Sequence, residues 1–194
     1  MTQKSEATTL LDLLEGGDPK HVAVGVPDGP TITYDSLKRQ VYSIASHLKA
    51  LGIRRSDRVA IVLPNSAEAI VTFLGVISVA TSVPLNPAYK PTEFRFYLKD
   101  TGVRALITSP QKMDEFRGVT TDSTILVGVS TDSAGEVTLS DMGGKKISGS
   151  VGVPASDDVA LVLHTSGTTS SPKRVLLQHQ NLIASVRNIV NTYS

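Results

Sequence analysis

The sequence predicts an α/β protein built on a mostly parallel sheet, with helices on both faces of that sheet. The main observation is the order of its segments. Between residues 58 and 129, short apolar runs of strand length alternate with longer runs of helical periodicity. Strands that alternate with helices usually pair in parallel, and the connecting helices cover the sheet. A second observation is that residues 67–79 are apolar nearly all round, as expected of a buried helix.

Length and composition are those of one globular unit. The chain has 194 residues, of which 40% are hydrophobic and 19% are charged. A chain of this length buries roughly 70% of the surface of its unfolded form, so it needs no metal or disulfide to fold. We therefore expect one domain, or one large subdomain, with its own core.

Charge and cysteine content exclude several kinds of partner and site. The net charge of +1 gives no argument for nucleic-acid binding. The longest apolar stretch, 67–84, is interrupted by polar residues, so it predicts a core helix and not a membrane span. The absence of cysteine excludes disulfides, zinc–thiolate sites and a thiol nucleophile. We expect a reducing compartment, the cytoplasm, with the peroxisome as the alternative.

The first 52 residues predict a short helix, a hairpin and a long helix. Leucines within residues 10–14 predict a helix that a preceding threonine can cap. Residues 21–26 and 31–34 predict two strands joined by a turn rich in Pro, Asp and Gly. Apolar residues at helical spacing then predict a helix that begins at residue 35 or 36 and ends before Gly52.

The alternating part follows, and after it the pattern is lost for some thirty residues. In chain order we expect a strand at 58–63, a helix at 67–79, a strand at 82–86, a helix from Pro91 to Gly102, a strand at 104–109, a short helix at 110–117 and a strand at 124–129. Residues 130–156 are rich in Gly, Ser and Asp and have no periodicity. They predict an irregular excursion within the domain.

The chain then returns to an apolar strand, 159–163, that ends in a polar loop, and an amphipathic helix is expected directly after the loop. The loop consists of His164, Thr165, Ser166, Gly167, Thr168, Thr169, Ser170, Ser171, Pro172, Lys173 and Arg174. Hydroxyl and backbone N–H groups can face an anion, Gly167 permits close approach of the backbone, and Lys173 adds a positive charge. The loop therefore predicts phosphate binding. The alternative is a polar surface turn, since the same residue types form turns.

One familiar phosphate loop is excluded by spacing. The Walker A motif requires Gly-x-x-x-x-Gly-Lys followed by Ser or Thr. Here Lys173 follows Pro172 and precedes Arg174, so both the glycine and the magnesium-binding hydroxyl are missing. The chain is not a Walker-type NTPase.

The loop resembles instead that of the AMP-forming acyl-activating enzymes, which include acyl-CoA synthetases, 4-coumarate–CoA ligases, luciferases and nonribosomal adenylation domains. The resemblance rests on Thr165-Ser166-Gly167-Thr168-Thr169 followed by Pro172-Lys173, and it continues through residues 175–182. Upstream landmarks in family order are Thr33-Tyr34-Asp35-Ser36-Leu37, Asp57-Arg58-Val59-Ala60, Pro64-Asn65-Ser66 and Pro84-Leu85-Asn86-Pro87. The resemblance covers nearly the whole chain and implies the N-terminal subdomain of the adenylate-forming enzyme fold.

Two details resemble the oxalate–CoA ligase branch of this family. Ser170 stands where most members have Gly, and residues 84–89 and 93–98 are similar to that branch. The resemblance implies ATP, Mg²⁺ and coenzyme A as cofactors or co-substrates. It implies a carboxylic acid as substrate, with oxalate as the leading candidate, and no nucleic acid or membrane span.

The implied reaction has two steps, in which a carboxylate attacks the α-phosphate of Mg-ATP with loss of pyrophosphate, and the CoA thiol then displaces AMP. By motif position, the residues that would hold the β- and γ-phosphates are Thr165, Ser166, Gly167, Thr168, Thr169 and Lys173. Ser170 and Ser171 would line the same loop. Arg174 stands where the family usually has Gly; it could contact phosphate, but hindrance or neutrality is the expected effect. The resemblance assigns no catalytic residue and no metal ligand within the chain.

The chain ends inside a helical pattern, before the other motifs of the family. We therefore expect residues 1–194 to be the N-terminal portion of an AMP-binding domain that is inactive alone and exposes apolar faces. The alternative hypothesis is a non-catalytic truncated paralogue that binds nucleotide weakly or needs a partner chain.

Other residues that suggest chemistry have simpler interpretations. His164 is expected to be a hydrogen-bonded residue at a strand end and not a base, and His179 is expected to help begin the last helix. We expect core positions for Phe94, Phe96 and Tyr97, a solvated loop for Gly143-Gly144-Lys145-Lys146, and no two-carboxylate site at Asp157 and Asp158.

Overall fold

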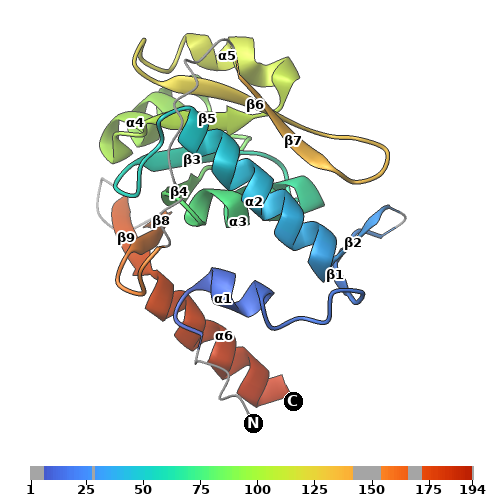
Figure 1. Cartoon of the computed structure of the whole chain (residues 1–194). Coiled ribbons are helices and arrows are strands. Elements are labelled where there is room, and N and C mark those ends of the chain that lie inside the picture. The colour runs from blue at the N-terminus through green and yellow to red at the C-terminus, as the bar shows by residue number, and fades with distance from the viewer. Residues whose placement is uncertain (1–6, 28, 142–153, 166–171, 194) are drawn as a thin grey trace.

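The computed structural model describes residues 7–27, 29–141, 154–165 and 172–193, and Figure 1 labels its elements. In chain order these are α1 (Leu10–Leu14), β1 (Val22–Gly25), β2 (Thr31–Thr33), α2 (Tyr34–Ala50), β3 (Arg58–Val62), α3 (Ala67–Ile77), β4 (Thr81–Pro84), α4 (Pro91–Thr101), β5 (Ala105–Thr108), η1 (Pro110–Lys112), α5 (Met113–Arg117), β6 (Ile125–Thr131), β7 (Val137–Asp141), β8 (Val159–Thr165), β9 (Lys173–Gln178) and α6 (His179–Tyr193). Among these residues, no helix is both long and apolar enough to cross a membrane.

A seven-stranded sheet runs through the molecule in the order β7-β6-β5-β3-β4-β8-β9. The five inner strands are parallel, and each outer strand is antiparallel to its neighbour. β1 and β2 form a separate antiparallel hairpin. The predicted fold class and the predicted N-terminal hairpin are both confirmed.

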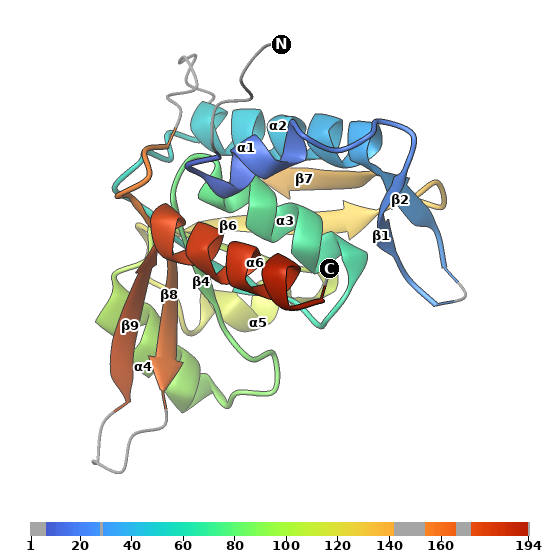
Figure 2. The same ribbon diagram turned by 90° about the horizontal axis from the view of Figure 1, so that it is seen from below.

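Helices cover both faces of the sheet (Figure 2). Each face has its own hydrophobic cluster. On one face, α2 and α3 pack through buried side chains such as Ile44 and Val76. On the other face, α4 and α5 pack through Phe94, Leu98 and Phe116. Burying one side chain of this size contributes about 1.5–3 kcal/mol, so the two clusters provide most of the driving force for folding.

Two glycines are required by this packing. A Cβ on Gly75 would lie 2.4 Å from Cγ2 of Ile44, so the close approach of α3 to α2 needs a residue without a side chain. Gly102 ends α4 in the left-handed conformation, with a φ of 59°, as expected for a glycine that terminates a helix.

The connections that leave β3 and β4 go to opposite faces of the sheet. β3 continues into α3, which belongs to the first cluster, whereas β4 continues into α4, which belongs to the second. Adjacent strands with diverging connections leave a crevice at their carboxyl ends, and open α/β sheets bind ligands in such crevices. β8 pairs in parallel with β4, so the carboxyl end of β8 reaches the same edge.

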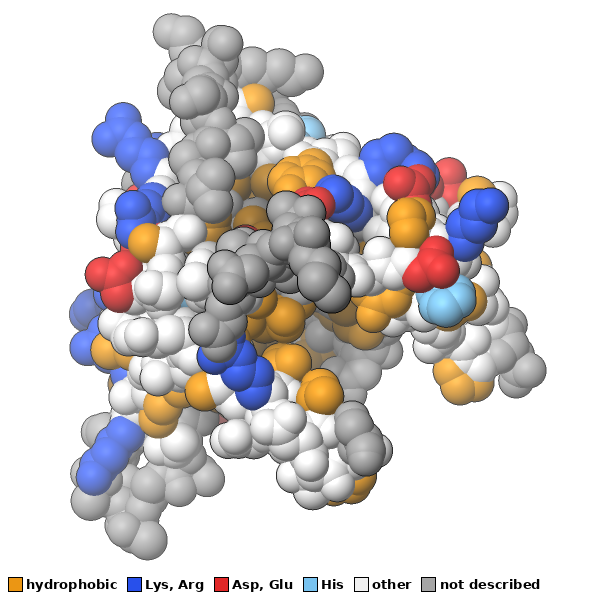
Figure 3. Space-filling model, turned by 60° about the horizontal axis from the view of Figure 1, so that its bottom comes forward, with side chains coloured by type: hydrophobic (Ala, Val, Ile, Leu, Met, Phe, Trp, Pro, Cys, Tyr) orange, Lys and Arg blue, Asp and Glu red, His pale blue; other side chains and the backbone are white. Residues whose placement is uncertain are grey.

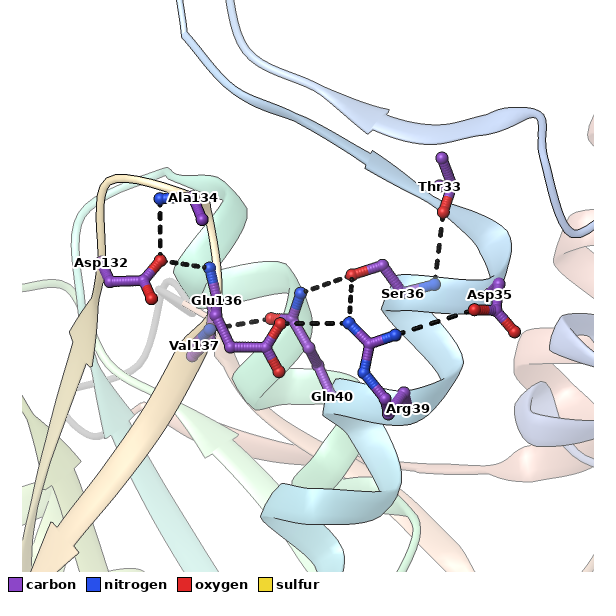
Figure 4. Close-up of polar contacts among 9 residues, drawn as sticks. All are labelled: Thr33, Asp35, Ser36, Arg39, Gln40, Asp132, Ala134, Glu136 and Val137. Carbon is purple, nitrogen blue, oxygen red and sulfur yellow. Dashed lines mark hydrogen bonds and ion pairs between the residues drawn. The ribbon is translucent and has the colours of Figure 1, made fainter.

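One buried amide fixes β7 to helix α2 (Figure 4). Gln40 is 1% exposed. Its Oε1 accepts a hydrogen bond from the backbone N–H of Val137 at 2.8 Å, and its Nε2 donates to Oγ of Ser36 at 3.0 Å. Arg39 adds an ion pair with Glu136 at 3.2 Å. The position of β7 on the sheet edge is thus specified by contacts within the chain.

The prediction of an irregular excursion at 130–156 is wrong in its first part, because β6 and β7 form a hairpin there. The Asp132 carboxylate accepts hydrogen bonds from the N–H groups of Ala134 and Glu136, which closes the turn. The missed signal was apolar and polar alternation from Val137 onward. Residues 142–153, which include the Gly-Gly-Lys-Lys segment, lie outside the described residues.

A second correction concerns the stretch after the phosphate loop. A helix was expected there, but Lys173–Gln178 form β9, which pairs with β8, and only then does α6 begin at His179. The strand forms because of a tertiary contact. Pairing with β8 satisfies the backbone hydrogen-bonding groups of residues 173–178, and their local sequence does not specify this pairing. His179 is the first residue of α6, at the position that the sequence predicted.

Candidate phosphate-binding site

A groove of about 1160 Å³ opens where the ends of β3, β4 and β8 meet. Its walls include the segments that follow β3 and β4, one face of α3, the β1 end of the N-terminal hairpin and Leu163 of β8. Figure 3 shows hydrophobic side chains around a central hollow on the side of the molecule that carries α6. The groove lies at the crevice that the strand connections predict, so it is the natural place for a ligand.

The hairpin of β8 and β9 brings two of the predicted phosphate ligands together. Thr165 is paired with Lys173 in the register of the hairpin, and Oγ1 of Thr165 lies 3.5 Å from the carbonyl oxygen of Lys173. The other predicted ligands, Ser166, Gly167, Thr168 and Thr169, lie outside the described residues together with Ser170 and Ser171. Thr165 and Lys173 therefore mark where the phosphate loop leaves the sheet and returns to it.

Alternation along the two strands gives the hairpin two chemically different faces. Leu163 lines the groove, and Thr165, two residues further along β8, lies on the same face. Lys173 faces the same way because directly opposed residues of an antiparallel pair share a face. A hydroxyl and an ammonium group are thus placed on the groove side of the hairpin, next to an apolar wall.

On the opposite face, His164 is held against helix α4. Its Nε2 lies 3.1 Å from Oδ2 of Asp100, and its ring packs against that of Tyr97 with the centroids 4.6 Å apart. The His164 side chain is only 5% exposed. The prediction of a hydrogen-bonded histidine at a strand end is confirmed, and this residue has no access to the groove that a base would need.

Arg174 contacts the same carboxylate. Its Nε lies 3.4 Å from Oδ2 of Asp100, and its Nη1 donates to the backbone oxygen of Asp100 at 3.1 Å. Sequence reasoning did not identify Asp100 or this role of Arg174. No local pattern points to Asp100, because the contact depends on how α4 lies beside the hairpin.

The aromatic residues of α4 follow the expected core pattern only in part. Phe94 is buried and packs edge-on against Phe116, as predicted. Tyr97 is half-buried between Tyr89 and His164, and burial, followed by its hydrogen bond with Tyr89, raises the pKa of its hydroxyl. Phe96 is exposed, so the prediction of a core position for it is wrong.

The amino-terminal end of β8 is tied down by a different set of charges. Burial acts to raise the pKa of Asp158, but hydrogen bonds from Arg55 and from the N–H of Ala155 outweigh it and leave that pKa below its ordinary value. Burial lowers the pKa of the nearby His179. A small cavity of about 280 Å³ lies beside these residues, near the amino ends of β3, β4 and β8. The groove lies at the opposite, carboxyl ends of these strands. The Asp158 carboxylate is thus held by Arg55 and Ala155, which gives it a structural role.

Among the described residues, no group of three His, Cys, Asp or Glu side chains is placed to hold a metal ion. What the site offers is a hydroxyl and an ammonium group beside an apolar groove, at the switch point of a doubly wound α/β sheet. These features are those of an open α/β sheet, a class of protein in which ligands commonly bind at the carboxyl ends of the strands.

Comparison with known proteins identifies the family. The AMP-binding enzyme family matches residues 15–194, and the chain belongs to this family. It is 40% identical over 168 residues to "Probable CoA ligase CCL9" of Humulus lupulus, covering 84% of the present chain and 32% of that protein. It is 36% identical over 197 residues to the oxalate–CoA ligase of Arabidopsis thaliana, covering 97% and 38%.

Solved structures agree with these sequence matches. MatB from Rhodopseudomonas palustris superposes with a TM-score of 0.78 at 25% identity in its apo form, and with 0.76 at 26% in its ATP-bound form. In each case the match covers 96% of the present chain and 38% of MatB. The chain thus spans 32–38% of the length of these relatives.

Proposed function

We propose that this chain forms the part of an AMP-forming acid–CoA ligase that holds the polyphosphate of ATP. The observation that carries the proposal is the pairing of Thr165 with Lys173 at the carboxyl edge of the sheet, where the loop 166–171 leaves and returns. Membership of the AMP-binding enzyme family and likeness to an ATP-bound structure support the choice of ATP.

The proposed chemistry needs positioning and charge neutralisation more than covalent help from the protein. A carboxylate oxygen of the acid attacks the α-phosphorus of ATP, the bond to the β-phosphate oxygen breaks, and pyrophosphate leaves. The thiolate of coenzyme A then attacks the acyl carbon of the adenylate and AMP leaves. Mg²⁺, bound to the polyphosphate, neutralises part of its charge.

In this scheme the chain's own residues restrain the leaving group. The ammonium of Lys173 and the hydroxyl of Thr165 contact oxygens of the β- and γ-phosphates, with Ser166, Gly167, Thr168 and Thr169 of the loop. A charge-assisted hydrogen bond contributes about 1.5–3 kcal/mol, so Lys173 accounts for roughly a 10- to 100-fold gain in affinity. The apolar groove beside them would exclude water from the reacting phosphate.

We propose oxalate as the acid. Relatives described as oxalate–CoA ligases, from Arabidopsis thaliana and Saccharomyces cerevisiae, are 36% and 33% identical to this chain. None of the described residues has been assigned to contact with the acid. The choice of oxalate therefore rests on these relatives.

The binding half of the proposal is tested on the 194-residue chain by calorimetric titration with Mg-ATP and with pyrophosphate. K173A should weaken both ligands roughly 10- to 100-fold. K112A, which removes an exposed lysine from η1 beside β6, serves as the matched control and should bind as the unaltered chain does. Equal affinities for K173A and K112A would contradict the assignment of the site.

The catalytic half is tested by pyrophosphate release in the presence of ATP, Mg²⁺, coenzyme A and a panel of acids. The 194-residue chain alone should not turn over. A chimera in which it replaces the matching segment of the Arabidopsis oxalate–CoA ligase should turn over oxalate and lose this activity with K173A. If the chain binds ATP but a folded chimera is inactive with every acid, the non-catalytic alternative is the correct one.

A further inference from the structure

We propose that Asp100 is a positioning residue that fixes where Thr165 and Lys173 lie, by holding β8 and β9 together beside them. The inference rests on the proposed function and extends it to residues outside the loop. Its basis is that one carboxylate, near the end of α4, contacts one residue of β8 and the residue directly opposite it on β9.

The geometry places this clamp one residue away from the phosphate ligands on each strand. His164 and Arg174 are paired in the hairpin register, and the next pair is Thr165 with Lys173. Oδ2 of Asp100 lies 3.1 Å from Nε2 of His164 and 3.4 Å from Nε of Arg174. A rotation or twist of either strand that moved Thr165 or Lys173 would have to break one of these contacts.

The backbone of Asp100 takes part as well. The last carbonyl groups of a helix have no partner within the helix, and they form the negative end of its dipole. Nη1 of Arg174 donates to the carbonyl oxygen of Asp100 at 3.1 Å, and Nη1 of Arg58 donates to that of Thr101 at 2.7 Å. Arg174 therefore binds the end of α4 at two points, which fixes the direction of its guanidinium group.

Packing restricts the histidine in the same way. The ring of His164 lies against that of Tyr97, which is one helical turn before Asp100 and so on the same face of α4. Between a ring contact and a hydrogen bond, the imidazole has little freedom to rotate. The two strands are thus docked on α4 through one ring contact and one charged contact.

This arrangement assigns a role to Arg174, the residue that departs from the family pattern. Its side chain lies on the face of the hairpin opposite to Lys173, because neighbouring residues of a strand point to opposite faces. It is engaged with Asp100 at two points and is directed away from the phosphate side. Arg174 therefore holds β9 against α4 from the face opposite to Lys173, and it is not a phosphate ligand.

The size of the expected effects separates a positioning role for Asp100 from a role in the stability of the fold. The Asp100 and Arg174 side chains are 30% and 44% exposed, and ion pairs with this exposure contribute little to folding. Replacing Arg174 should therefore leave the melting temperature nearly unchanged, and D100N keeps a side-chain oxygen beside the buried His164 ring. The effect of either change should appear in the affinity for phosphate, which depends on where Thr165 and Lys173 are held.

The test uses D100N and R174G in the 194-residue chain, with D114N as the control. D114N neutralises the exposed Asp114–Arg117 ion pair on α5, far along the sheet from the hairpin. D100N and R174G should each weaken Mg-ATP about three- to tenfold, and the double variant should be no weaker than D100N alone, since both act through one contact. R174K should recover only part of the loss, because lysine cannot contact two acceptors with one planar group.

Amide resonances provide a readout that does not depend on ATP. D100N and R174G should shift the amide signals of Thr165 and Lys173 in the unliganded chain, whereas D114N should not. Failure of K173A to weaken ATP would reject the proposed function and leave the clamp to be judged by these shifts. Unchanged amide signals of Thr165 and Lys173 in D100N, or tighter ATP binding by R174G, would reject the clamp itself.

Discussion

An antiparallel hairpin forms each outer edge of the sheet, β6–β7 on one side and β8–β9 on the other. The two hairpins differ in how much of their apolar surface is buried. At one edge, β7 is fixed by the buried Gln40, and its first residue, Val137, is 1% exposed. At the other edge, Val175 and Leu176 of β9 are 37% and 54% exposed. The first hairpin completes the core. The second presents a polar tip, an apolar groove side and a charged clamp.

The difference separates stability from function. An edge strand with its apolar residues covered contributes to the folding free energy, and variation there is limited by packing. An edge strand with exposed apolar residues contributes less, and its sequence is free to serve a ligand or a neighbouring segment. Variants at the β6–β7 edge should therefore lower the free energy of unfolding. Variants at the β8–β9 edge should mainly change phosphate binding.

The largest effect on stability is expected for Q40A. This variant leaves the N–H of Val137 without a partner in the interior and removes the volume of the amide, which together should cost about 2–3 kcal/mol of unfolding free energy. Denaturant unfolding measures the loss. Q111A, at an exposed position in η1, is the matched control and should stay within about 0.5 kcal/mol. A loss below about 1 kcal/mol for Q40A would mean that the buried amide does not fix β7.

A matched pair of valines compares the two edges directly. V137A removes two buried methyl groups and should cost about 1.5–2 kcal/mol, at roughly 0.8 kcal/mol for each. V175A removes the same groups from a position that is already 37% exposed, so it should cost only about two-thirds as much. Both values come from chemical denaturation of the same chain. Equal losses would show that β9 contributes to the core as β7 does.

Ion pairs on the two hairpins should be nearly silent in stability but not in binding. Arg39 pairs with Glu136 at the β6–β7 edge, and Arg174 pairs with Asp100 at the β8–β9 edge, with all four side chains partly exposed. R39A and R174A should each change the unfolding free energy by at most about 1 kcal/mol. Only R174A should weaken Mg-ATP in calorimetry. A similar loss of affinity in R39A would point to a general effect of removing positive charge.

The sequence was informative where local rules and tertiary structure agree. The alternation of strands and helices predicted the parallel sheet, and residues such as Ser66 and Gly102 marked helix ends that the structure contains. β7 and β9 were missed because the edge strands are selected by pairing with neighbours, which no local window contains. Their weak signals, such as alternation after Gly135, were outweighed by the glycine- and serine-rich composition around them.

The candidate site was predictable to a similar extent. The motif located Thr165 and Lys173, since phosphate binding requires particular residue types at close spacing in the chain. It could not reveal that the two residues face each other across a hairpin. Asp100 was invisible for the same reason, because its contacts join residues 64 and 74 positions apart.

The smallest effect expected is a dependence of stability on pH at the base of the β8–β9 hairpin. His179 follows β9 directly and is buried, and this burial lowers the pKa of its imidazole below the ordinary value of 6.5. The unfolded chain therefore takes up a proton near pH 6.5, while the folded chain does so only at lower pH. The free energy of unfolding should be constant just above this value and fall as the pH drops from about 6.5 through the folded pKa.

H179Q should flatten this slope, whatever its own stability, while H21Q, at an exposed histidine, should retain it. The measurement is the unfolding free energy between pH 5 and 8, obtained from denaturant titrations at each pH. The lowered pKa of Asp158 acts in the same direction but only in the more acidic range, below its ordinary value of 3.8. A slope that persists in H179Q would place the responsible group elsewhere, and the base of this hairpin would then be no more sensitive to pH than the covered edge.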